Sequence, residues 1–277
     1  MQKYRLLIKT DDQIGIIYKV TKILYNHSIN IEKNNEFVDL EKNKFFMRSE
    51  ITGNINRENL LKDLKEQFEK STEIRIIPET KKNIVLLVTK ESHCLGDILI
   101  RYQNQELSAN IKGVISNHNN LQSLVENFKI PFFTVPHQDL SREEHEQEII
   151  KILNVLQPEL IVLAKYMRIL SPEFVSLYPQ KILNIHHSFL PSFIGANPYK
   201  QAYQRGVKII GATAHYVNNF LDDGPIVSQD ILHIDHSFSW QDMQRAGRDV
   251  EKVVLAKALN LVLEDHVFVE ENKTIVF

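Results

Sequence analysis

Cysteine is nearly absent from this sequence, because Cys94 is the only one among 277 residues. A single cysteine cannot form a disulfide within the chain, which is typical of proteins in a reducing compartment. Long apolar runs are missing too. No segment approaches the roughly 18 apolar residues of a membrane span, and the N-terminal stretch MQKYRLLIKTDD has too short an apolar run for a signal peptide. The sequence therefore predicts a cytoplasmic protein with no membrane partner.

An excess of one charge is also lacking. The chain has 33 Lys and Arg residues against 35 Asp and Glu residues, and its net charge is -2. A nucleic-acid partner requires a basic surface, so none is expected. The apolar and charged fractions, 43% and 25%, are those of a globular protein.

Two common phosphate-binding motifs, G-x-G-x-x-G and the P-loop, do not occur, so dinucleotide binding through such a loop is unsupported. The segment HEQEI at 145–149 begins like the zinc-protease motif H-E-x-x-H, but Ile149 replaces the second histidine. We expect this segment to form a charged, solvated face of a helix.

The first eighty residues follow the order β-α-β-β-α-β, which is that of the ferredoxin-like α+β unit. Expected strands lie at 3–10, 29–40, 44–52 and 73–79, and expected helices follow Gly15 and cover 56–70. The helices are expected to bury Ile16, Ile17, Val20, Ile23 and Leu24 in the first, and Leu60, Leu61, Leu64 and Phe68 in the second. The polar stretch 78–83 predicts a linker between domains at 1–80 and 81–277.

After the linker, apolar strands alternate with helical patterns. Expected strands lie at 83–89, 111–116, 131–135, 159–164, 181–186 and 208–217, expected helices at 93–104, 120–129, 142–156 and 237–264, and a closing hairpin at 266–277. This alternation predicts an α/β domain with a doubly wound, mostly parallel sheet. Functional groups in such a sheet usually lie at the carboxyl ends of the strands.

Polar side chains gather at two of these strand ends. In the segment KILNIHH, period-two alternation puts Asn184 and His186 on one face and His187 on the other. His215 ends another strand, and the loop Asp222-Asp223-Gly224 follows it. Each piece taken alone is consistent with a hydrogen-bonded corner or a solvated turn. A metal site is disfavoured, because adjacent histidines of a strand face opposite ways, so we expect no metal.

Together these groups would suit acyl chemistry. An amide and an imidazolium can both donate to a developing oxyanion, and a carboxylate of the loop could activate a nucleophile. No serine or cysteine lies beside a base, so attack by water or an amine is favoured over a covalent intermediate. We expect Asp222 to point inward, Asp223 to face solvent and His187 to be structural.

Four segments in order resemble the formyl-transferase family that handles 10-formyltetrahydrofolate: LAKYMRILS (163–171), NIHHSFLPSF (184–193), GATAHYV (211–217) and LDDGPIV (221–227). The resemblance implies that Asn184, His186 and Asp222 are catalytic, with His215 behind them. It implies a folate cleft lined by Met167, Arg168, Ile169, Leu170, Val217, Phe220 and Leu221. It also implies that 10-formyltetrahydrofolate is a substrate and that no cofactor is needed. Arg168 either contacts the folate or extends over the edge of the cleft.

The N-terminal unit resembles an ACT domain in its D-x-x-G turn, Asp12 to Gly15, and in Asn30-Ile31 at the start of a strand. An ACT domain ahead of a formyl-transferase domain is the arrangement of the formyltetrahydrofolate deformylase family, which hydrolyses 10-formyltetrahydrofolate to formate and tetrahydrofolate. The resemblance implies a small amino-acid effector, such as glycine or methionine, near Asp12, Gly15 and Asn30. It also implies a homo-oligomer, a dimer or a tetramer.

Two alternatives stay open. The first is a formyltransferase to an amine, for example glycinamide ribonucleotide. Those enzymes carry a loop rich in Gly, Ser and Asn after the first strand, whereas ESHCLGD (91–97) has two acids that would repel a phosphate. The second is a catalytically silent sensor that binds folate or an amino acid. The hydrolase is favoured over both.

Overall fold

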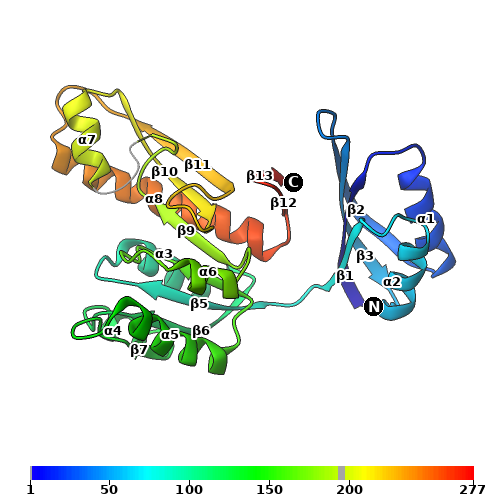
Figure 1. Cartoon of the computed structure of the whole chain (residues 1–277), viewed down its shortest axis with the longest axis horizontal. Coiled ribbons are helices and arrows are strands. Elements are labelled where there is room, and N and C mark those ends of the chain that lie inside the picture. Colours follow the sequence, from blue (N-terminus) through cyan, green and yellow to red (C-terminus); the bar gives the residue numbers. More distant parts are fainter. Residues whose placement is uncertain (1, 193–196) are drawn as a thin grey trace. The chain divides into compact units, whose positions relative to one another are not determined.

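The computed structural model describes residues 2–192 and 197–277, and its chain divides into two compact units, residues 1–80 and 81–276 (Figure 1). Phe193, the last residue of the segment NIHHSFLPSF, lies outside the described residues. Within those residues, every helix is too short or too polar to span a membrane. Each unit is described by itself.

The N-terminal unit is a four-stranded antiparallel sheet with two helices. Its elements are β1 (Gln2–Asp11), α1 (Ile16–Asn26), β2 (Asn30–Asp39), β3 (Lys44–Gly53), α2 (Arg57–Glu66) and β4 (Glu73–Pro78). The strand order β2-β3-β1-β4 and the antiparallel pairing confirm the ferredoxin-like prediction. Asn56 begins α2 by accepting a hydrogen bond from the backbone N–H of Asn59, as an N-cap residue does.

One residue of the predicted α1 core faces outward. Ile16, Val20 and Leu24 are buried, but Ile17 is 42% exposed, so its assignment to the core was wrong. Ile17 lies seven residues before Leu24 and therefore about 20° from it around the helix, so its exposure goes with its place in the first turn, at the end of the apolar stripe, and not with its angle.

The second unit is built on a seven-stranded sheet in the order β11-β10-β9-β8-β5-β6-β7. The strands are β5 (Lys82–Val88), β6 (Ala109–Ser116), β7 (Phe132–Thr134), β8 (Leu160–Leu163), β9 (Ile182–His186), β10 (Ile209–Tyr216) and β11 (Ile226–His233). Strands β5 to β9 pair in parallel, which confirms the mostly parallel prediction, whereas β10 and β11 run antiparallel. Strand β11 was not predicted. A separate hairpin, β12 (Val267–Glu270) and β13 (Lys273–Val276), ends the unit.

Helices cover both faces of the sheet, which explains the continuous apolar run in β5. Leu86 and its even-numbered neighbours pack with α3 (His93–Gln103), α4 (Gln122–Glu126) and α8 (Trp240–Leu263). Leu87 and Val85 pack on the other face with α5 (Arg142–Leu156) and α6 (Pro172–Leu177). The short helices α6 and α7 (Pro198–Arg205) were not predicted.

In the segment HEQEI of α5, Gln147 and Glu148 are exposed but His145 and Glu146 are buried, so its prediction as a solvated face was wrong for those two residues. His145 is 1% exposed and its Nε2 donates to the carbonyl of Val135 at 3.0 Å. Glu146 is 5% exposed and its carboxylate accepts hydrogen bonds from the backbone N–H and the hydroxyl of Ser171. Polar groups are tolerated in a core when they are bonded in this way. The bonds tie α5 to the loop that precedes α6.

The burial along α1 can be tested by two substitutions in the same helix. Leu24→Ala should lower the free energy of unfolding by about 2–5 kcal/mol, because it leaves a cavity in a filled core. Ile17→Ala should cost less than about 1 kcal/mol in the same urea denaturation. An equal loss for both variants would show that the exposed face of α1 is covered.

Candidate active site

The carboxyl end of β9 and the loop after β10 open onto a cavity of about 610 Å³. Every residue predicted for catalysis or folate binding lines it: Asn184, His186, His215, Asp222, Met167, Arg168, Ile169, Leu170, Val217, Phe220 and Leu221. These residues come from three separate segments, 167–170, 184–186 and 215–222, which the fold brings together.

Antiparallel pairing of β9 with β10 places His215 directly opposite Asn184. Nδ2 of Asn184 donates to Nε2 of His215 at 3.2 Å, while Nδ1 of His215 donates to the carbonyl of Tyr216 at 3.0 Å. Burial lowers the pKa of His215, so the ring is neutral and its Nε2 is free to accept. His215 therefore orients the Asn184 amide and leaves its second N–H for the cavity.

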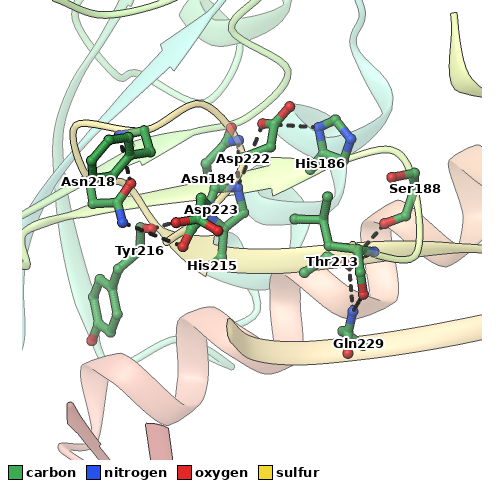
Figure 2. A network of polar contacts seen from close by, with 12 residues as sticks. Asn184, His186, Ser188, Thr213, His215, Tyr216, Asn218, Asp222, Asp223 and Gln229 are labelled. Carbon is green, nitrogen blue, oxygen red and sulfur yellow. Dashed lines mark hydrogen bonds and ion pairs between the residues drawn. The ribbon is translucent and has the colours of Figure 1, made fainter. Parts of the chain in front are cut away.

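His186 is held from the side by a carboxylate. Its Nδ1 lies 3.2 Å from Oδ1 of Asp222, and both side chains are almost fully buried (Figure 2). Its Nε2 is buried and has no hydrogen-bond partner in the described part of the chain. A buried polar atom without a partner is costly, so this nitrogen is suited to meet a bound ligand.

The strand after His186 is fixed by Thr213, which lies opposite it in the β9–β10 pair. Its hydroxyl donates to the carbonyl of Ser188 at 2.8 Å and accepts from the backbone N–H of Leu190 and from Gln229 (Figure 2). These hydrogen bonds fix the backbone at Ser188 and Leu190, just after His186 and His187.

The loop after β10 turns the carboxylate of Asp222 toward the histidines. Its side chain is only 8% exposed, whereas Asp223 is exposed. Asp222 has a φ of 54°, in the left-handed region that few residues other than glycine adopt. At Gly224, any Cβ would lie 1.7 Å from the carbonyl oxygen of Tyr216, so only glycine fits. Gly224 is thus required by the backbone of this turn.

The folate-cleft prediction corresponds to two loops with exposed apolar side chains. Met167, Ile169, Phe220 and Leu221 are each at least 50% exposed. The loop that carries Met167 and Ile169 is held by two hydrogen bonds to its backbone. The N–H of Met167 donates to Thr89 at 2.9 Å, and Arg142 donates to the carbonyl of Ile169 at 2.7 Å. Exposed apolar groups on a fixed frame suit a flat, largely apolar ligand.

His187 was predicted on the face opposite His186, but it lines the same cavity, one residue after β9 ends. Its ring lies 5.2 Å from that of His186 and 6.0 Å from that of Tyr199, between centroids. Burial and the nearby charge of Lys165 lower its pKa to about 3, so the ring is neutral.

A charged group beyond His187 was missed as well. Lys165, Tyr199 and Glu251 line the same cavity, with Glu91 and Arg248 near them. These residues come from separate helices and loops, and none belongs to a recognised catalytic motif. Their sequence positions alone therefore could not predict that they lie together.

The predicted effector residues lie in the N-terminal unit. Asp12 is in the turn after β1, Gly15 precedes α1 with a φ of 88°, and Asn30 begins β2 on an exposed position.

Comparison with known proteins decides the family. The formyl transferase family matches residues 82–259, and the ACT domain family matches residues 4–69. The formyltetrahydrofolate deformylase of Haemophilus influenzae is 53% identical over 276 residues, which are 100% of this chain and 99% of that protein. The chain belongs to the formyltetrahydrofolate deformylase family.

Solved structures agree with this assignment. A formyltetrahydrofolate deformylase from Pseudomonas syringae is 43% identical, with a TM-score of 0.96 over 100% of this chain and 95% of its own. A phosphoribosylglycinamide formyltransferase from Coxiella burnetii is 28% identical, with a TM-score of 0.66 over 71% of this chain and 93% of its own. As a member of the deformylase family the chain is an enzyme, which confirms the prediction of a hydrolase.

One group of side chains in this deformylase-family chain has the spacing of a metal site among the described residues: His93, Cys94 and Glu251. Glu251 already accepts a hydrogen bond from His93 at 2.7 Å and lies 3.2 Å from Nζ of Lys165. Burial raises the pKa of the Cys94 thiol, which keeps it protonated. A metal ion would have to displace a lysine and deprotonate this thiol, so these residues do not fit one.

The turn that carries Asp222 can be tested through its glycine. Gly224→Ala should lower the free energy of unfolding by about 1–3 kcal/mol, because the loop must move away from Tyr216. Gly96→Ala in α3 is the control. Its Cβ would meet no atom within 4 Å, and alanine should stabilise that helix by up to about 1 kcal/mol. Equal stability of Gly224→Ala and the unsubstituted chain would contradict the close approach.

Proposed function

We propose that the chain hydrolyses 10-formyltetrahydrofolate to formate and tetrahydrofolate. The relatives that match it over its whole length carry the name of this activity. The observation that carries the proposal is the buried Nε2 of His186, which lacks a partner in the described structure while Nδ1 of the same ring is held by Asp222.

In this proposal the folate binds in the apolar part of the cavity. The pterin lies between the loop with Met167 and Ile169 and the loop with Phe220 and Leu221, whose side chains are exposed without it. Arg168 lines the same part. Burial of this apolar surface would contribute about 25 cal/mol per Å² to binding.

The formyl oxygen accepts hydrogen bonds from Nδ2 of Asn184 and from Nε2 of protonated His186. Such donors, fixed before the reaction, are each worth about 3 kcal/mol when charge develops on the oxygen. Asp222 stabilises the imidazolium through Nδ1 at 3.2 Å. No serine or cysteine nucleophile takes part.

Asp222 holds a water molecule and accepts one of its protons as the water oxygen bonds to the formyl carbon. A tetrahedral intermediate forms, with its oxyanion facing Asn184 and His186. Its collapse breaks the carbon–nitrogen bond. The folate nitrogen takes a proton from His186 or from water, and formate leaves.

The rival amine transferase uses the same three residues, and the phosphoribosylglycinamide formyltransferases are structural neighbours. A phosphate-bearing acceptor would meet Glu91, which lines the cavity at the first turn of the α/β unit. Release of formate without any acceptor distinguishes the hydrolase from this rival and from a silent sensor.

The role of Asp222 can be tested against its neighbour in the same loop. Asp222→Asn should abolish measurable formate release with the fold intact, because general-base catalysis is worth about 10²–10⁴-fold and an amide accepts no proton. Asp223→Asn makes the same charge change on an exposed side chain and should keep near-normal turnover. His186→Ala and Asn184→Ala should each lose at least about 10²-fold in kcat. Near-normal turnover by Asp222→Asn would contradict the mechanism.

We further propose that the ACT domain binds a small amino acid and that the chain forms a homo-oligomer in which these domains pair. Support comes from the match of the ACT family to residues 4–69. Asp12, Gly15 and Asn30 are the proposed contacts.

Effector binding can be tested by measuring formate release with and without glycine or methionine. The rate should change with one of them, and Asn30→Ala should remove the response. Asn54→Ala, at an exposed turn of the same unit, should retain it. A rate unaffected by either amino acid would contradict this choice of effector.

A further inference from the structure

The cavity has a second part whose chemistry the proposed hydrolysis does not use. Its apolar part is formed by the loops around Met167 and Phe220, whereas beyond His187 it is lined by Lys165, Tyr199 and Glu251. Buried charges are costly, so a fold retains them only where they are bonded or used.

Glu251 is the centre of this part. It is 1% exposed in helix α8, and its two oxygens accept hydrogen bonds from the hydroxyl of Tyr199 and from Nε2 of His93, each at 2.7 Å. Nζ of Lys165, which is 4% exposed, lies 3.2 Å away. Burial alone raises the pKa of Glu251, but the bond from His93 and the charge of Lys165 outweigh it and hold the pKa at about 2. Lys165 and Glu251 therefore form a buried ion pair, and His93 and Tyr199 donate hydrogen bonds to its carboxylate.

The backbone is shaped to present these side chains. Lys165 has a φ of 64°, in the region that favours glycine, yet the chain places a long cationic side chain there. At Gly247, one turn before Glu251, an added Cβ would lie 2.0 Å from the hydroxyl oxygen of Tyr199, so this glycine makes room for the tyrosine. A lysine with a left-handed backbone and a glycine that leaves room for a tyrosine thus serve one polar cluster.

A single neutral imidazole separates this cluster from the reacting centre. The ring of His187 lies 5.2 Å from that of His186 and 6.0 Å from that of Tyr199. With folate in the apolar part, a nucleophile larger than water would have to occupy the space beyond His187. The Lys165 side chain lines that space, and a protonated amine there would meet its ammonium group.

We infer that the buried Lys165–Glu251 pair, fixed by His93 and Tyr199, is a specificity-determining element that closes the cavity to amine acceptors and leaves water as the nucleophile. This inference rests on the proposed hydrolysis. It concerns which nucleophile reaches the formyl carbon and assigns no role in activating it. In the excluded reaction, the amine nitrogen would bond to the formyl carbon, lose a proton and displace the same folate nitrogen.

The test measures how the formyl group is divided between water and an amine. The intact chain and two variants, Lys165→Gly and Lys165→Gly/Glu251→Gln, are given 10-formyltetrahydrofolate with and without glycinamide, and formate and formylglycinamide are quantified. Glycine suits the φ at position 165, and the glutamine avoids an unpaired charge. The ratio of formylglycinamide to formate should rise at least tenfold in the variants, and the unsubstituted chain should not exceed the ratio found without enzyme.

The control removes a buried ion pair elsewhere in the same unit. Lys82 and Asp265 lie 2.5 Å apart at the amino end of β5, at the opposite edge of the sheet from the cavity. The variant Lys82→Ala/Asp265→Asn should keep the ratio of the unsubstituted chain.

Two results would overturn the inference: an unchanged ratio in variants that still release formate, or formylation of glycinamide by the unsubstituted chain. The second needs no variant and so does not depend on folding of the substituted chains. Absence of formate release by the unsubstituted chain without glycinamide would instead contradict the proposed function.

Discussion

Antiparallel pairing of β9 with β10 is the constraint on which the site depends. The register sets His215 opposite Asn184, which it orients, and Thr213 opposite His186, where the Thr213 hydroxyl holds the chain at Ser188 and Leu190. Because side chains alternate along a strand, a slip of one residue would turn Asn184 and His186 away together. The carboxyl end of β9 lies beside those of the other parallel strands. The antiparallel strand β10 then adds His215 and the Asp222 loop at the same place.

Left-handed residues and glycines that no larger residue could replace mark both ends of the cavity. Asp222 and Lys165 adopt left-handed conformations, and Gly224 and Gly247 lie where a side chain would clash. Such positions persist only where the surrounding structure determines them. Here they present a carboxylate to His186 at one end and a lysine to Glu251 at the other. The two buried charge pairs differ. His186 of the first pair has a ring nitrogen without a partner in the described structure, whereas both carboxylate oxygens of Glu251 in the second pair accept hydrogen bonds.

Much of the fold followed from local patterns. Period-two alternation placed Asn184 and His186 on one face, and the apolar run of β5 predicted burial on both sides. The failures share a physical cause. His145 and Glu146 of HEQEI were predicted to be solvated because their partners, Val135 and Ser171, lie outside the helix, 10 and 25 residues away. Ile17 has the side chain and the angle of a core residue but lies in the first turn of α1, where the apolar stripe ends. The antiparallel direction of β10 and the cluster around Glu251 depend on tertiary pairing, which no local pattern encodes.

The central claim is that Asn184 and His186 hold the formyl oxygen while Asp222 supports His186. It is tested most directly by a crystal structure of the chain with tetrahydrofolate and formate. The account predicts the pterin between the loops of Met167 and Phe220, and one formate oxygen within hydrogen-bond distance of both Nδ2 of Asn184 and Nε2 of His186. Folate bound elsewhere, or formate that contacts neither nitrogen, would contradict it.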